Sequence, residues 1–132
     1  IWNALRKVQL SYFVEKLATG LDTQIGEKGT CLSGGENQRL ALARLWFDDS
    51  ELVILDEATS AIDNLTEESV MKAVMQQLNG KTVIAIAHRL NSIAGFDRII
   101  LFKDGKIVGQ GNFEELLRTN AYFVDLYNAN VQ

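Results

Sequence analysis

The sequence predicts an α/β protein with a parallel βαβ core. Two solid apolar runs of strand length, 52–55 and 82–87, suit strands that are buried on both faces of a parallel sheet. Between them, residues 64–79 carry their apolar side chains on one helical face, and Asn79-Gly80 ends that helix. A strand, a crossover helix and a second strand require the two strands to be parallel.

This arrangement places three chemically active side chains at one edge of the sheet. Asp56 and Glu57 follow the first strand and His88 follows the second, at the edge where open α/β sheets bind ligands. One carboxylate can hold Mg²⁺ while the other deprotonates a water nucleophile. In the alternative interpretation, Asp56 starts a turn and Glu57 is solvated. His88 is either a structural histidine or a contact of a γ-phosphate.

Helical segments precede this core. Apolar spacings over 2–17 predict one broken helix or two short ones, and a loop rich in Gly and Thr follows over 19–30. A helix begins at Ser33, where Glu36 completes a capping box three residues later, and we expect it to end near Asp48.

The C-terminal part predicts a hairpin followed by helices. Strands over 99–102 and 107–109 are joined across Asp104-Gly105, a pair that readily adopts the positive φ angles of a tight turn. Residues 112–128 have helical spacing.

The helix start at Ser33 is also a candidate anion site. Gly34 and Gly35 leave backbone N–H groups at the positive end of the helix dipole, with no Cβ to keep a phosphate away. Alternatively, Ser33 and Glu36 only cap the helix, and a capping box standing alone would favour that interpretation.

One apparent phosphate motif is excluded. Gly80-Lys81-Thr82 mimics the end of a P-loop, but Met75 stands where the motif needs glycine, and the triplet follows a helix and enters a strand. The 132 residues therefore contain no phosphate-cradling P-loop.

Composition limits the partners of the chain. With 13 basic and 17 acidic residues the net charge is -4, which argues against a nucleic-acid partner held through phosphate neutralisation. Cys31 is the single cysteine and cannot form an internal disulfide, so a reducing environment is expected. The apolar runs of the chain are far shorter than the ~20 residues that are needed to cross a bilayer. Because the chain begins with Ile1 and shows no signal peptide, we expect a piece of a longer protein.

Four motifs in order resemble the nucleotide-binding domain of ATP-binding cassette (ABC) proteins. The motifs are Leu32-Ser33-Gly34-Gly35-Glu36 with Gln38-Arg39 (signature), Leu52 to Asp56 with Glu57 (Walker B and catalytic acid), Ser60-Ala61-Ile62-Asp63 (D-loop) and His88 (switch histidine). The resemblance covers essentially the whole chain but only the C-terminal half or so of such a domain. It implies a partial P-loop NTPase-like (ABC ATPase) domain, with a helical signature portion over 1–48 and a Walker B and H-loop core over 49–132. The Walker A loop and the Q-loop of the family would fall before Ile1.

The resemblance also implies roles at the sheet edge. Asp56 would coordinate Mg²⁺, usually through water, Glu57 would act as the general base for ATP hydrolysis, and His88 would contact the γ-phosphate. Since Glu57 and His88 are both present, nothing marks a degenerate site.

The signature implies a site shared between two domains. Ser33, Gly34 and Gly35 would bind the γ-phosphate of ATP held by a second ABC nucleotide-binding domain, and Asp63 would communicate across that dimer. Glu36 stands where glutamine is more usual in the family.

Other segments resemble the exporter branch. The loop Thr23 to Gly29 looks like the one that exporters place against the coupling helices of their transmembrane domain, and the run Asp56 to Asp63 also looks like exporters. The resemblance thus implies the ATP-binding and ATP-hydrolysing region of an ABC exporter at the cytoplasmic face of the cell membrane. The exported substrate would be, for example, a peptide, a lipid or a drug.

Two alternatives stay open at this point. One is a non-catalytic module that lends its signature surface to a partner. The other is a DNA-associated ABC ATPase, which the acidic balance and the exporter-like loops disfavour. For the isolated chain we expect very weak ATP affinity, no turnover, and exposed apolar surface that promotes dimerisation or exchange of elements.

Overall fold

A computed structural model describes residues 1–26, 29–87 and 89–130, without the side chains of Asn91 and Asn130. The chain divides into two compact units, Ile1–Ile86 and Ala87–Gln132, and each is described by itself. Among the described residues, no helix is both long and apolar enough to cross a membrane.

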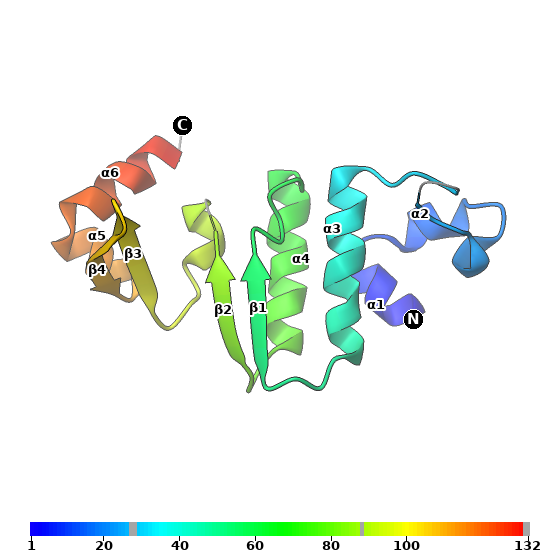
Figure 1. The fold of residues 1–132 in the computed structure, drawn as a ribbon, viewed down its shortest axis with the longest axis horizontal. Helices are drawn as coiled ribbons and strands as arrows, with labels where there is room; N and C mark the ends of the chain where they lie inside the picture. Colours follow the sequence, from blue (N-terminus) through cyan, green and yellow to red (C-terminus); the bar gives the residue numbers. More distant parts are fainter. Residues whose placement is uncertain (27–28, 88, 131–132) are drawn as a thin grey trace. The chain divides into compact units, whose positions relative to one another are not determined.

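The first unit contains helices, short 3-10 helices and two strands (Figure 1). They are α1 (Trp2–Lys7), α2 (Ser11–Glu15), η1 (Gly20–Asp22), α3 (Gly34–Ala43), η2 (Arg44–Phe47), β1 (Leu52–Asp56), α4 (Asn64–Gln77) and β2 (Thr82–Ile86). The N-terminal segment thus forms two short helices, one of the two forms its spacing predicts. The helix after Ser33 ends as a 3-10 turn that is capped at Asp48, as expected from the sequence.

The predicted βαβ core is confirmed. Strands β1 and β2 pair in parallel from Leu52 opposite Thr82 to Asp56 opposite Ile86, with α4 as the crossover between them (Figure 1). Because the register is regular, both strands end at the same edge of the sheet.

One face of this sheet packs into the core. Val53 and Leu55 are buried in one cluster with the apolar stripe of α4, which includes Val70 and Val74. Each such aliphatic side chain contributes roughly 1.5–3 kcal/mol when it is fully buried. Burial of this face therefore holds β1 against α4.

The prediction that both faces of the strands are buried was wrong for this chain. The alternate side chains Leu52, Ile54, Ile84 and Ile86 are 50%, 62%, 50% and 51% exposed. Successive residues of a strand point to opposite faces, and the helices of the first unit cover only one of them. The expected exposed apolar surface is therefore confirmed, and these four residues are named the open face.

The junction between α1 and α2 is tied to the longer helices. Gln9 has a positive φ of 57°, its carbonyl accepts a hydrogen bond from Arg39 Nη1 (2.8 Å), and its side chain donates to Ser69 Oγ (3.0 Å). Since Arg39 lies on α3 and Ser69 on α4, one residue joins both helices to the N-terminal segment.

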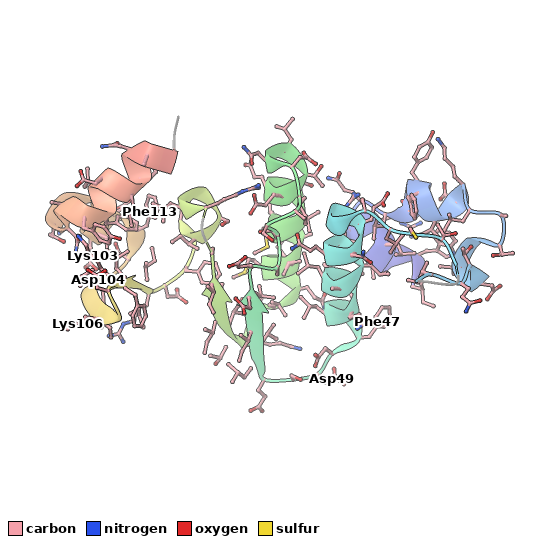
Figure 2. All side chains as sticks on the ribbon, turned by 45° about the horizontal axis from the view of Figure 1, so that its top comes forward. Phe47, Asp49, Lys103, Asp104, Lys106 and Phe113 are labelled. Atoms are coloured by element: carbon pink, nitrogen blue, oxygen red, sulfur yellow. The ribbon has the colours of Figure 1, made fainter. Side chains whose placement is uncertain are left out.

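The second unit contains the predicted hairpin and C-terminal helices. Its elements are η3 (Leu90–Ile93), β3 (Ile99–Lys103), β4 (Lys106–Gly111), α5 (Phe113–Thr119) and α6 (Ala121–Asn130). Strands β3 and β4 are antiparallel, and both turn residues, Asp104 (φ 50°) and Gly105 (φ 73°), are left-handed as the hairpin turn requires. Figure 2 shows Lys103 and Asp104 beside Lys106 at this turn.

The core of the second unit is aromatic. Phe123 is fully buried, and the ring of Phe113 meets the rings of Phe123 and Tyr127 edge to face, with centroids 5.4 and 5.7 Å apart. Asn112 begins α5 with a capping box that is closed by Glu115. The unit therefore has its own packed interior.

We predict that the 132-residue chain self-associates through the open face. Ile54→Lys places a charge in the middle of this face, so it should convert the associated form to monomer, as measured by light scattering at about 100 μM protein. Leu65→Lys is the matched control, because Leu65 is 86% exposed in the first turn of α4, outside this face. Wild-type chain that is already monomeric at this concentration would contradict the prediction.

Candidate functional site

The two predicted carboxylates lie at the carboxyl edge of the parallel sheet. Asp56 is the last residue of β1, opposite Ile86, and its side chain is exposed. Glu57 follows, and its backbone N–H donates to the carbonyl of Ile86 (3.1 Å), so the pairing with β2 extends one residue beyond the strand. Pairing with β2 thus fixes the backbone positions of both acids at the sheet edge.

Glu57 turns the chain sharply away from the strand. Its φ is 45°, in the left-handed region, which costs an L-residue about 1–2 kcal/mol. Such strained residues persist only where their surroundings hold them, and they concentrate at functional sites. Glu57 is therefore a strained residue at the sheet edge, and its role as the general base stays a prediction.

The segment Glu57–Asp63, here called the D-turn, is anchored on α4. Thr59 Oγ1 donates to Glu67 Oε1 (2.6 Å), and Glu67 is only 6% exposed. At its end, Asp63 caps α4 by accepting from the backbone N–H of Thr66 (3.0 Å). The hydrogen bond from the Thr66 backbone holds the pKa of Asp63 below its ordinary value.

The predicted capping box at the start of α3 is confirmed. The N–H of Ser33 donates to Glu36 Oε2 (2.7 Å), and the N–H of Glu36 donates to Ser33 Oγ (3.2 Å). Two hydrogen bonds lower the pKa of Glu36: the larger effect comes from the backbone of Ser33 and the smaller from its side chain. Glu36 thus serves as a cap in this chain, as the sequence predicted.

The two signature glycines lie against the D-turn. A Cβ on Gly35 would come within 2.9 Å of the Ala61 carbonyl oxygen, and one on Gly34 within 3.2 Å of the Ala61 Cβ. The sequence explained these glycines by access for a phosphate. The structure adds a second reason, because only glycine lets α3 approach the D-turn this closely at Gly35.

Gln38, which the sequence indicates only as part of the signature, contacts the D-turn. Its amide nitrogen donates to the Glu57 carbonyl (3.1 Å) and to Ser60 Oγ (2.9 Å), and its amide oxygen accepts from the Ala61 N–H (2.8 Å). A glutamine at the fifth position of a helix carries no pattern that reveals its partners about 20 residues away, so only the fold identifies this contact.

Seven of the eight predicted site residues, all except His88, belong to the first unit. Within it, Gly34 and Gly35 of α3 lie against Ala61 of the D-turn. His88 lies outside the described residues, and so do Glu27 and Lys28 of the exporter-like loop.

Asp56 is suited to Mg²⁺. Mg²⁺ binds oxygen ligands and is usually held by one or two protein carboxylates together with substrate phosphates and water. Over residues 1–26, 29–87 and 89–130, no group of three or more His, Cys, Asp or Glu side chains forms a complete metal site. An exposed carboxylate at a strand end fits a site that the phosphates of a substrate would complete.

Comparisons with known proteins agree with this fold. The family described as ABC transporter matches residues 2–60. The heterocyst differentiation ATP-binding protein HepA of Nostoc sp. is 48% identical over 105 residues, which is 80% of this chain and 17% of that protein. The ATP-dependent lipid A-core flippase of Desulfotalea psychrophila is 46% identical over 128 residues, which is 97% of this chain and 22% of the flippase.

A solved structure gives the same result. The structure of a bacterial Atm1-family ABC exporter with ATP bound matches with a TM-score of 0.89 and 34% identity, and the match covers 99% of this chain and 23% of that one. The fold is thus the P-loop NTPase-like α/β fold of ABC exporter ATP-binding domains, as predicted. The chain belongs to the ABC transporter family, and it spans about a fifth of the length of the curated relatives it matches.

We predict that Gly35→Ala destabilises the chain by about 1–3 kcal/mol, because the new methyl group must displace the backbone of Ala61. Urea unfolding measures this change. Gly95→Ala is the matched control, since a Cβ at Gly95 meets nothing within 4 Å, and its effect should stay within about 0.5 kcal/mol. Equal stabilities of the two variants would show that α3 does not approach the D-turn closely.

We also predict that capping by Glu36 makes the stability depend on pH. The pKa of Glu36 is lower in the folded state than in the unfolded state. Its carboxylate therefore contributes its full stabilisation of the fold at pH values above the pKa of the unfolded state, and this contribution is lost as the pH falls through the pKa of the folded state. Glu36→Gln keeps a capping box without the titrating group. Between about pH 5 and pH 3, the free energy of unfolding should fall less in Glu36→Gln than in the wild type. Identical slopes would contradict a charged cap.

Proposed function

We propose that this chain is the C-terminal part of the ATP-hydrolysing domain of an ABC exporter. The observation that carries the proposal is the acidic pair at the end of β1, where Asp56 closes a parallel strand and Glu57 follows in a left-handed conformation beside β2. The match to an ATP-bound exporter and the similarity to an ATP-dependent flippase support it.

The two acids divide the chemistry between them. Glu57 accepts a proton from the attacking water, a step in which a positioned base contributes typically 10²–10⁴-fold. Asp56 would hold Mg²⁺ directly or through water, and the bound ion would supply charge neutralisation at the phosphates. His88 contacts the γ-phosphate in this proposal.

The signature contributes to a second site. The first N–H groups of a helix have no intrahelical acceptor and lie at its positive end, which suits an anion. As the resemblance to the family signature implies, we propose that Ser33, Gly34 and Gly35 contact the γ-phosphate of ATP held by a second nucleotide-binding domain. Asp63, at the end of the D-turn, relays the state of one site to the other.

Transport requires further partners. We propose that the whole protein pairs two nucleotide-binding domains with a transmembrane domain, with this region at the cytoplasmic face of the membrane. ATP hydrolysis would drive export of a substrate such as a peptide, a lipid or a drug. The names of the relatives support an exporter, and no nucleic acid is involved in this mechanism.

The test compares ATP hydrolysis by the whole protein with that of Glu57→Gln. Glutamine is nearly isosteric but cannot accept the proton, so kcat should fall about 10²–10⁴-fold while ATP binding persists. Glu68→Gln is the matched control, because Glu68 is an exposed acid on α4 outside the site. Negligible and equal rates in wild type and Glu57→Gln would favour the non-catalytic module instead.

A further inference from the structure

We propose that Gln38 is a positioning residue that holds Glu57 in its reactive orientation. This inference rests on the proposed function, because it assigns to Gln38 an effect on the general base of that reaction. Gln38 acts on the backbone of the D-turn and needs no contact with ATP or with the attacking water.

Three hydrogen bonds carry the inference. The amide nitrogen of Gln38 donates to the Glu57 carbonyl and to Ser60 Oγ, and its amide oxygen accepts from the N–H of Ala61. A carbonyl can only accept and a backbone N–H can only donate, so these partners fix which end of the amide faces which group. One side chain from α3 therefore bridges both ends of the segment from Glu57 to Ala61.

Glu57 needs such a restraint because its backbone is strained. Its left-handed φ of 45° is unfavourable, so the residue would relax toward a common conformation if its surroundings released it. Its N–H is held by the carbonyl of Ile86, and its carbonyl accepts from Ser60 N–H (3.1 Å) and from Gln38. Of these three bonds, only the one from Gln38 comes from a side chain.

The direction of the Glu57 side chain follows from this backbone. A rotation about φ swings the carboxylate as a whole, and a misplacement of about 1 Å in an active site can cost roughly a hundredfold in rate. Loss of the Gln38 bonds should therefore lower the rate of the chemical step more than it lowers substrate binding.

Gln38 also joins the D-turn to the signature. It lies about one helical turn after Gly34 and Gly35, which themselves pack against Ala61. The start of α3 and the D-turn thus form one packed piece, and a shift of α3 would change the position of Glu57 through Gln38.

The test uses Gln38→Glu in the whole protein. The new carboxylate keeps the length and still accepts from Ala61 N–H, but it cannot donate to Glu57 or Ser60. We expect kcat for ATP hydrolysis to fall at least about tenfold, with KM for ATP within about twofold of the wild type and a melting temperature within about 2 °C. Gln38→Met, which keeps the length without adding a charge, should show the same split between kcat and KM.

Gln77→Glu is the matched control, because Gln77 is an exposed glutamine at the end of α4, and it should behave as the wild type. Wild-type kcat in Gln38→Glu or Gln38→Met would overturn this inference and leave the proposed function intact. A fall in kcat that is matched by a rise in KM or by lost thermal stability would also overturn it, because Gln38 would then be structural only. A wild-type protein without ATPase activity would overturn the proposed function first.

Discussion

The candidate site depends on the way β1 ends. Parallel pairing with β2 carries Asp56 to the sheet edge, and the bond from the Glu57 N–H to Ile86 extends that pairing into a residue with left-handed backbone. Without the bond to Ile86, Asp56 would still end the strand, but Glu57 would lie outside the pairing with β2. Here the sheet fixes one side of Glu57, and its strain, about 1–2 kcal/mol, is offset by the hydrogen bonds that meet there.

Two helices then hold the segment that follows. On one side, Asp63 and Glu67 bind the D-turn to α4, and α4 is itself packed on the buried face of the sheet. On the other side, Gly35 and Gln38 bring α3 against it. The D-turn is therefore held from two sides by hydrogen bonds and packing within the chain, and a chemical step that needs a base in one orientation benefits from such a scaffold.

Much of this could be predicted from local sequence. Solid apolar runs gave the strands, the crossover helix gave their parallel direction, and Ser33 with Glu36 gave the cap of α3. The exposure of the open face was not predicted. An apolar run such as 52–55 shows that both faces of the strand are apolar, but it does not show which face other parts of the same chain cover. The hydrogen bonds of Gln38 were not predictable, since they join α3 to residues about 20 positions away and depend on the packing of α3 against the D-turn.

We infer that these intrachain contacts hold the D-turn in one conformation even when no nucleotide is bound, and amide hydrogen exchange of the chain measures this. The N–H groups of Glu57 and Ala61 donate to Ile86 and to Gln38, respectively. We expect that, without nucleotide, both amides exchange at least about a hundredfold more slowly than in an unstructured peptide. Exchange of both at the unprotected rate would show a turn that opens freely, and it would contradict a preorganised site.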